Sequence, residues 1–259
     1  MRKLTPVEEM IWNEGERLIP GVTHNQAEVV RHKSSYLFFR KIIESDLRIE
    51  AKKRSPIQIA DLGCGVGYGC RILSKIRGAH ILGVDISPET LSYAQNHYAA
   101  ANITYQLVNL ADFIPRMPQF DYVVSRGVFE HIPNGLDLAF STKWQYRLLF
   151  DIPYNESKER NPHHVLCEIH EENLSRFPET ELFFQDLDGI IYGSHGKPSH
   201  PNMMICVCSD SKLSKVEGSE IEFPFRGWEL ERNTVFKNRR WEAIRQWITK
   251  TMPNRNGSR

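Results

Sequence analysis

The chain has 259 residues, enough for one sizeable domain with appended pieces. Hydrophobic residues make up 41% and charged residues 25% of the chain, a composition that excludes disordered and collagen-like proteins. The formal net charge of +1 gives no overall attraction to nucleic acid or to an anionic membrane.

The N-terminus, "MRKLTPVEEMIWNEGER", lacks the apolar stretch of a signal peptide, and no later window approaches the length of a transmembrane helix. We therefore expect a cytoplasmic protein without a transmembrane segment. The five cysteines are odd in number and include no pair or Cys/His cluster with zinc spacing. They are interpreted as reduced, buried residues, and no metal site is predicted.

Residues 1–55 are predicted to form an N-terminal helical cap. Within "AEVVRHKSSYLFFRKIIESDLRIEAKK" the apolar residues recur at helical spacing, from Val30 through Tyr36 to Ile43. We expect this helix to pack on the main domain and to serve as a lid. Tyr36 belongs either to the core or to a ligand site.

Residues 56–212 show the alternation of apolar runs and helix-like stretches that is typical of a Rossmann-like α/β fold. We expect seven strands in a mostly parallel sheet with helices on both faces, the last two strands forming an antiparallel edge. The predicted strands are "QIADLGC", "HILGVDI", "NITYQLVN", "FDYVVSRG", "RLLFDIPY", "ELFFQDLDGIIY" and "MMICVCSD".

Residues 213–259 are predicted to be a C-terminal extension packed on the main domain. Basic residues and two tryptophans interleave between Lys237 and Arg259, a pattern that also occurs in nucleic-acid-binding segments. On an amphipathic helix it more often separates a core side from a solvent side, so we do not expect nucleic-acid binding.

A glycine-rich loop follows the first predicted strand. Such a loop exposes backbone N–H groups to a ligand without obstructing side chains. The dinucleotide pattern GxGxxG does not fit, because its last glycine would fall on Tyr68 or Cys70, and no Lys-Ser or Lys-Thr of a P-loop follows. The glycines alternate along "DLGCGVGYG": Gly63, Gly65, Gly67 and Gly69.

An acidic residue, Asp85, ends the second predicted strand 18 residues after Gly67. In a doubly wound fold this position lies beside the first loop, where a carboxylate can accept hydrogen bonds from both hydroxyls of a ribose. A glycine loop followed by this acid, without a pyrophosphate fingerprint, is the arrangement expected for S-adenosylmethionine.

Three segments together resemble the class I S-adenosylmethionine-dependent methyltransferases: "DLGCGVGYG", "ILGVDIS" and "FDYVVSRGVFEHIP". The resemblance covers roughly residues 56–135. It implies that Asp61, Gly63, Gly65 and Gly67 line the methionine end of the cofactor, that Asp85 holds the ribose, and that Ile86 packs on the adenine. Further cofactor contacts are expected from Asn109, Leu110, Ser125 and Tyr36.

The flanking segments "NEGERLIPG", "RHKSSYLFF" and "PYNESKERNPHHV" are similar to methyltransferases of bacterial O-antigen and other surface-glycan synthesis. The chain departs from that pattern at Ser34 and Ser35, where these relatives often carry His and Arg. Arg17, in the first segment, is expected either to bind an anionic group of the acceptor or to pair with an acid of the cap.

Transfer of a methyl group to a hydroxyl requires a proton acceptor, and histidine suits this task at neutral pH. His131 follows the fourth predicted strand and is our candidate base, with Glu130 beside it orienting the ring or contacting the substrate. His164 follows the fifth strand in a Pro-flanked loop and is expected to bind the acceptor.

The sequence therefore predicts an enzyme that uses S-adenosylmethionine to methylate an oxygen of a sugar or glycan-linked acceptor. Two alternatives stay open. One is methylation of a lipid, quinone or other natural product in an apolar cavity formed by the N-terminal helices. The other is a cofactor-binding module without catalysis. The oligomeric state is not predicted.

Overall fold

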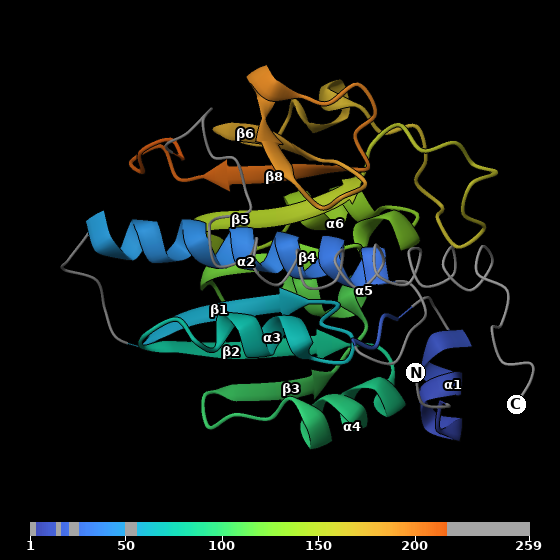
Figure 1. Cartoon of the computed structure of the whole chain (residues 1–259). Helices are drawn as coiled ribbons and strands as arrows, with labels where there is room; N and C mark the ends of the chain where they lie inside the picture. The colour runs from blue at the N-terminus through green and yellow to red at the C-terminus, as the bar shows by residue number, and fades with distance from the viewer. Residues whose placement is uncertain (1–3, 14–16, 21–25, 50–55, 217–259) are drawn as a thin grey trace, which may run out of the picture. The chain divides into compact units, whose positions relative to one another are not determined.

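The computed structural model describes residues 4–13, 17–20, 26–49 and 56–216. One eight-stranded sheet runs through it, in the order β3-β2-β1-β4-β5-β8-β6-β7 (Figure 1). The strands are β1 Ile57–Leu62, β2 Ala79–Asp85, β3 Ile103–Leu107, β4 Phe120–Arg126, β5 Trp144–Pro153, β6 Thr180–Gln185, β7 Ile191–Gly193 and β8 Met203–Ser209. The helices are α1 Pro6–Asn13, α2 Gln26–Ile49, α3 Tyr68–Leu73, α4 Pro88–His97, α5 Leu110–Phe113 and α6 Gly135–Phe140.

Strands β3, β2, β1, β4 and β5 are parallel, whereas β8, β6 and β7 are antiparallel. The mostly parallel Rossmann-like sheet and its antiparallel edge are thus confirmed. The expected count of seven strands is wrong, because the run "ELFFQDLDGIIY" forms two strands, β6 and β7, rather than one.

The turn between β6 and β7 explains the extra strand. Asp186 accepts hydrogen bonds through Oδ1 from the backbone N–H groups of Asp188 and Ile190, at 2.9 and 2.8 Å. Gly189 adopts a φ of +83°, which a side chain would disfavour. An Asp-initiated turn that ends on a left-handed glycine reverses the chain within a segment whose hydrophobicity alone suggests one strand.

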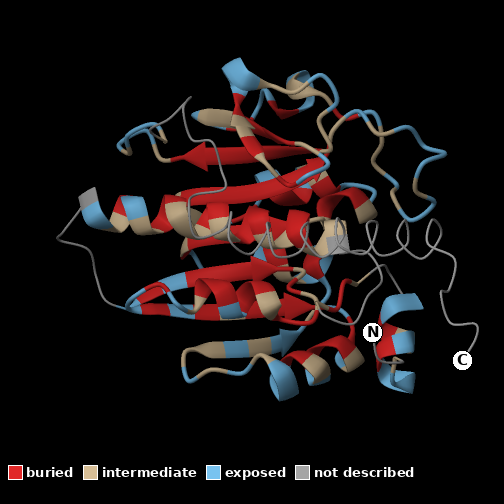
Figure 2. Cartoon of the chain, viewed as in Figure 1, coloured by how far each residue is buried: buried red, intermediate tan, exposed pale blue. Residues whose placement is uncertain are grey.

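Alternate residues of the central strands face different helices, and both faces of the sheet are buried (Figure 2). On one face Asp61 contacts Tyr36 of α2 and Cys70 of α3. On the other, Ala60 and Leu62 belong to a core cluster that includes Leu110, Ile114, Leu138 and Ala139 from α5, α6 and the segment between them. One apolar core therefore lies between the sheet and α5 and α6, and α2 buries further apolar side chains, among them Phe38 and Phe39.

Helix α2 lies on the opposite face from α5 and is held there by a buried ion pair. The Arg147 guanidinium donates from Nε and Nη2 to the two carboxylate oxygens of Asp46, at 2.8 and 2.9 Å. Ser35 lies eleven residues before Asp46, about three helical turns, and donates from Oγ to Asp151 at 2.8 Å. Because Asp151 follows Arg147 along β5, α2 runs antiparallel to β5, with its N-terminal half at the carboxyl edge of the sheet.

Helices α1 and α2 form within the segment where a helical cap was expected, and the pairs above pack α2 on the sheet. The extension expected over 213–259 lies almost wholly outside the described residues. None of the helices in the described residues combines the length and the apolar character needed to cross a bilayer.

Arg147→Met should lower the free energy of unfolding by about 3–5 kcal/mol, because it leaves the Asp46 carboxylate buried without its partner. Urea unfolding measures the change. The matched control is Arg40→Met, which removes a partly exposed pair with Glu44 and should cost at most about 1 kcal/mol. The double variant Asp46→Leu/Arg147→Met should recover most of the loss. Equal costs for the two single variants would contradict an anchoring role for Arg147.

Candidate functional site

The glycine loop leaves the carboxyl end of β1 and presents an open stretch of backbone. Gly65 has a φ of +53°, and a Cβ placed there would meet no atom within 4 Å. The backbone N–H of Gly65 donates to Oδ2 of Asp85 at 3.0 Å, so the loop is fixed by the acid at the end of the neighbouring strand. The loop and Asp85 therefore lie together, as the sequence predicts.

The Asp85 carboxylate already accepts contacts from three donors within the chain. Besides Gly65, the backbone N–H of Ser87 donates to Oδ1 at 3.0 Å, and Arg17 Nη2 lies 3.3 Å from the same oxygen. Arg17 thus pairs with an acid of the main domain rather than with one in the cap. A carboxylate offers about four acceptor positions, and three are engaged here. A ribose with two hydroxyls can bind both through Asp85 only if Arg17 shares or releases its position.

Asp61 lies under the loop rather than on its open side. Its two carboxylate oxygens accept hydrogen bonds from the Tyr36 hydroxyl at 3.1 Å and from Cys70 Sγ at 3.2 Å. Burial raises the pKa of Asp61 to about 7, although both hydrogen bonds oppose the rise. Tyr36 is 3% exposed and holds Asp61, which fits the expected core position and leaves its predicted cofactor contact a proposal.

The other predicted cofactor residues lie along the same edge. Ile86 is 59% exposed, unusual for an isoleucine and suited to stacking on a flat ring. Asn109 caps α5, accepting from Ala111 N–H at 2.9 Å, and the Leu110 side chain is buried in the core. The Ser125 hydroxyl is fully buried and donates to the Leu62 carbonyl at 3.0 Å, a contact that joins β4 to β1.

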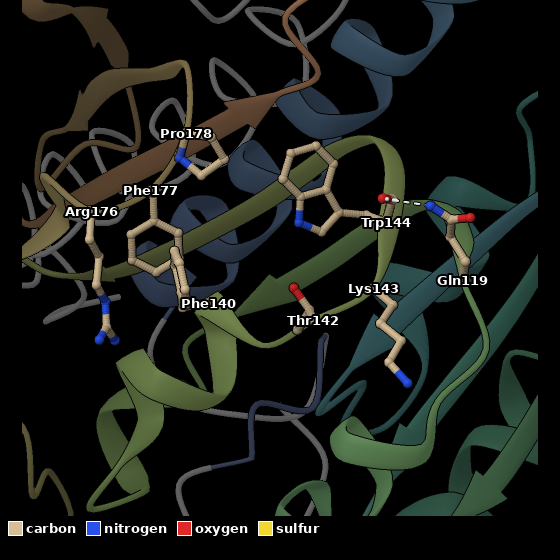
Figure 3. Close-up of a pocket in the computed structure, with 8 residues that line it drawn as sticks. All are labelled: Gln119, Phe140, Thr142, Lys143, Trp144, Arg176, Phe177 and Pro178. Atoms are coloured by element: carbon tan, nitrogen blue, oxygen red, sulfur yellow. Dashed lines mark hydrogen bonds between the residues drawn. The ribbon is translucent and has the colours of Figure 1, made fainter.

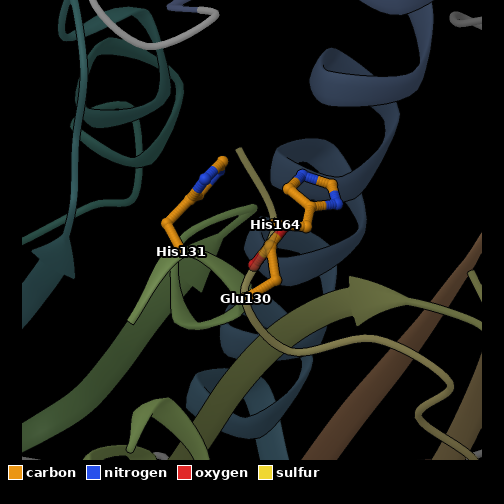
Figure 4. Close-up of side chains that lie close together, drawn as sticks. All are labelled: Glu130, His131 and His164. Atoms are coloured by element: carbon orange, nitrogen blue, oxygen red, sulfur yellow. The ribbon is translucent and has the colours of Figure 1, made fainter. Parts of the chain in front are cut away.

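The two candidate histidines come together, although they stand on different loops. The rings of His131 and His164 have centroids 4.8 Å apart and planes at 76° (Figure 4). The carbonyl oxygen of Glu130 accepts hydrogen bonds from the backbone N–H groups of Val165 and Leu166, at 2.9 and 3.0 Å. These bonds fasten the loop after β5 to the turn after β4 and so set the two rings side by side.

The hydrogen bonds of each ring assign it a tautomer. Nδ1 of His131 lies 3.1 Å from the carbonyl oxygen of His163; since a carbonyl only accepts, Nδ1 carries the proton and Nε2 holds the basic lone pair. Nδ1 of His164 contacts the Glu156 carboxylate, and its Nε2 lies 3.0 Å from the amide nitrogen of Asn161. The lone pair of His164 is therefore engaged by an amide.

Glu130 is buried beneath this pair, with Oε2 lacking a hydrogen-bond partner among the described residues. Burial raises its pKa to about 8, so the group is largely protonated at neutral pH. Ligand atoms of Glu130, His131 and His164 lie within 4.8 Å of one another, a spacing that a metal ion could also use. The sequence predicts no metal here, and the effect of a chelator on activity distinguishes a metal site from a pair of metal-free histidines.

Two further residues at this edge were not predicted. Arg126 ends β4 and Tyr68 begins α3. The Arg126 side chain is 5% exposed, yet Nε and Nη2 have no hydrogen-bond partner within the described residues, and the same holds for the buried Tyr68 hydroxyl. The sequence signal available was a charged residue closing an otherwise apolar buried strand.

A cavity of about 540 Å³ lies at the opposite edge of the sheet (Figure 3). Its lining includes Gln119 and Trp144, which stand at the amino ends of β4 and β5, together with Phe140, Arg176 and Phe177. Since the glycine loop follows the carboxyl end of a parallel strand, this cavity is remote from the loop and the histidines. We therefore do not include this cavity in the candidate site, although it is large enough for a small molecule.

Part of the chain is similar to known methyltransferases. Residues 59–145 match the family described as a methyltransferase domain. The ubiquinone biosynthesis O-methyltransferase of Actinobacillus pleuropneumoniae is 28% identical over 93 residues, which are 33% of this chain and 39% of that protein. The enzyme of the same name from Coxiella burnetii is 30% identical over 96 residues, 36% of this chain and 38% of its own. The chain thus spans about two fifths of these relatives.

Solved structures share the fold over a larger part of the chain. The N-terminal domain of EvdMO1, determined in the presence of SAH and D-fucose, has a TM-score of 0.53 at 13% identity and covers 78% of this chain and 92% of that one. Monomeric WbdD has a TM-score of 0.52 at 15% identity and covers 75% and 43%. The chain therefore carries a segment that matches a methyltransferase domain, residues 59–145, on a Rossmann-like sheet.

Proposed function

We propose that the protein transfers a methyl group from S-adenosylmethionine to a hydroxyl oxygen of a sugar or glycan-linked acceptor. The observation that carries the proposal is the pair of histidines at the carboxyl edge of the sheet, with His131 in the tautomer of a base and His164 fixed by Glu156.

The described residues fit the cofactor. The loop at Gly65 is open, Asp85 stands at the ribose position, and Ile86 offers an exposed apolar face for the adenine. Nε and Nη2 of Arg126 are buried without a hydrogen-bond partner among the described residues, although Asp151 and Glu28 lie 3.4 and 3.7 Å from them. When bound, the cofactor supplies an activated methyl group, so the protein has to orient the acceptor, exclude water and remove one proton.

In the proposed reaction a C–O bond forms as the C–S bond of the methyl group breaks, and S-adenosylhomocysteine leaves. His131 accepts the hydroxyl proton at Nε2, while its Nδ1–H stays on the His163 carbonyl. The imidazolium that results lies beside His164 and near the Glu156 carboxylate, which stabilises the added charge. The proton then passes to solvent, because His131 is only partly buried.

A polar acceptor suits the side chains around this edge better than a lipid or quinone does. The residues of α2 that face it include Glu28, Arg31 and Ser35, whereas a lipid or quinone requires an apolar cavity formed by the N-terminal helices. The likeness to the ubiquinone enzymes is confined to about a third of the chain. The loop that carries His164 lies beyond the family match, which ends at residue 145.

Release of S-adenosylhomocysteine in the presence of candidate acceptors tests the acceptor class. We expect turnover with nucleotide-linked or free deoxysugars and none with catechols or quinols. Turnover with a quinol alone would replace the sugar by the alternative acceptor. Cofactor binding without turnover of any acceptor would favour the non-catalytic module.

The wild-type protein should bind S-adenosylhomocysteine in calorimetry, and Asp85→Ala should weaken binding by about 1–3 kcal/mol through loss of a charged acceptor. Glu89→Ala is the matched control, because it removes a nearby acid that accepts a hydrogen bond from the Ser87 hydroxyl. Thermal melting checks that the Asp85→Ala variant is folded. Equal affinity of wild type and Asp85→Ala would show that the ribose lies elsewhere.

Affinity for S-adenosylmethionine should rise by up to about tenfold between pH 6 and pH 8. The pKa of Asp61 is about 7 in the free protein, and a cationic ligand nearby favours its ionised form. Binding therefore releases a proton below pH 7, and the affinity increases as the carboxylate ionises. Calorimetry in buffers of different ionisation enthalpy measures the proton release. In Asp61→Asn both effects should disappear; their persistence would assign them to another group.

His131→Ala should lower kcat by about 10²- to 10⁴-fold with little change in cofactor affinity, because the base acts only during proton transfer. His164→Ala should instead raise the KM of the acceptor. Steady-state kinetics with an identified acceptor measures both constants. A chelator should leave kcat unchanged; loss of activity on chelation, restored by a divalent metal, would make these histidines metal ligands instead.

A further inference from the structure

The base proposed for the transfer depends on one peptide group of another loop. Nδ1 of His131 donates to the carbonyl oxygen of His163 at 3.1 Å. The hydrogen bond made by one ring nitrogen determines where a neutral histidine carries its proton. Without such a partner the side chain in water prefers the proton on Nε2, which leaves no lone pair at Nε2 to accept another. The His163 carbonyl therefore keeps His131 in the tautomer that can act as a base at Nε2.

Asn161 orients this peptide group. The His163 N–H donates to Asn161 Oδ1 at 3.0 Å, and the His164 N–H donates to the Asn161 carbonyl oxygen at 3.2 Å. An Asn side chain that accepts from the N–H two residues later initiates such a turn. The His164 N–H and the His163 carbonyl belong to one peptide group, in which they point in opposite directions. Because the N–H is held on Asn161, the carbonyl is directed away from Asn161 and meets His131.

The amide of Asn161 is used at both ends. Its Nδ2 lies 3.0 Å from Nε2 of His164. Since Nδ1 of His164 contacts the Glu156 carboxylate, which only accepts, Nδ1 carries the proton and Nε2 accepts. The group that faces Nε2 is therefore the NH2 of the amide, and the amide oxygen lies on the side of the His163 N–H. The two contacts of the amide thus assign it the same orientation.

The rest of the loop is fastened by backbone hydrogen bonds. At its base the Glu168 N–H donates to the Glu156 carbonyl at 2.8 Å, and beyond the turn the Val165 N–H donates to the Glu130 carbonyl at 2.9 Å. His163 lies between these fastenings and is exposed, so a hydrogen bond to water would satisfy its carbonyl as well. The stability of the loop therefore does not require this carbonyl to face a histidine ring.

We propose that Asn161 is a positioning residue for the transfer reaction. It holds the His163 peptide group so that the carbonyl keeps the proton of His131 on Nδ1. This inference rests on the proposed function, because it assumes that His131 removes the proton of the acceptor. His164 contributes less to this effect, because the Asn161 oxygen can bind the His163 N–H without that ring.

NMR of the nitrogen-labelled protein measures the tautomer and needs neither cofactor nor acceptor. At about pH 9, where histidine side chains are neutral, long-range proton–nitrogen correlations distinguish the two tautomers. We expect His131 to carry its proton on Nδ1 in the wild type and predominantly on Nε2 in Asn161→Ala. Asn161→Asp keeps an oxygen for the His163 N–H and should retain the Nδ1 form. The control Lys158→Ala, at an exposed position of the same loop, should retain it too.

Steady-state kinetics with an identified acceptor connects the tautomer with the reaction. Asn161→Ala should lower kcat about ten- to hundredfold, the range typical of groups that orient a functional histidine, and change the KM of the acceptor little. Asn161→Asp should recover most of kcat. Calorimetry with S-adenosylhomocysteine should give the wild-type affinity for both variants. If Asn161→Ala does not fold, Asn161→Leu, of similar volume to the wild type, takes its place.

A His131 ring protonated on Nε2 in the wild type, or still on Nδ1 in the folded alanine or leucine variant, would overturn the inference. A loss confined to the KM of the acceptor would do so too and would assign Asn161 to acceptor binding. Failure of the wild type to turn over any acceptor, with the tautomers as expected, would instead remove the proposed function.

Discussion

The buried ion pair between Arg147 and Asp46 is the constraint on which the candidate site depends. It fixes α2 against β5 near the amino edge of the sheet, and the regular rise of the helix then determines which residues reach the carboxyl edge. Ser35 and Tyr36 reach Asp151 and Asp61 at that edge because the register at Asp46 is fixed. An anchor on one side of the fold thus positions groups on the other side.

Charge at the carboxyl edge is arranged so that few buried groups are ionised without a partner. Burial raises the pKa of Glu130 to about 8 and lowers the pKa of His32, so both are largely neutral at pH 7. Glu28 behaves differently: burial alone would raise its pKa, but the hydrogen bond from His32 and the charge of Arg126 hold it well below the usual range. What stays charged is a small set of acids around one arginine, Arg126.

The two loops after β4 and β5 give this edge its chemical character. Parallel strands end at the same edge, which brings the segments that carry His131 and His164 together, and the carbonyl of Glu130 then locks one loop to the other. The fold itself is shared by methyltransferases with different acceptors. The loop after β5 and helix α2 lie outside the matched family segment, whereas the turn that carries His131 lies within it.

The sequence by itself determined the elements whose signals are local. The alternation of apolar runs with helical segments predicted the parallel sheet, and the glycine loop with Asp85 predicted the edge where the site lies. The local turn at Asp186 and Gly189 divided a strand that hydrophobicity alone joined. The turn residues can be read from the sequence, but they lie within a long apolar run that by itself suggests a single strand.

Only the tertiary structure decided contacts between residues far apart in the chain. The pairing of Arg17 with Asp85, the tautomers of the two histidines and the orphaned donors of Arg126 depend on distances across several elements. Periodicity reports which way a side chain points along its own strand or helix, and so it carries no information about the partner it meets. The sequence does not show whether the donors of a buried arginine are hydrogen-bonded. Nε of Arg147 donates to Asp46, whereas Nε and Nη2 of Arg126 have no hydrogen-bond partner among the described residues.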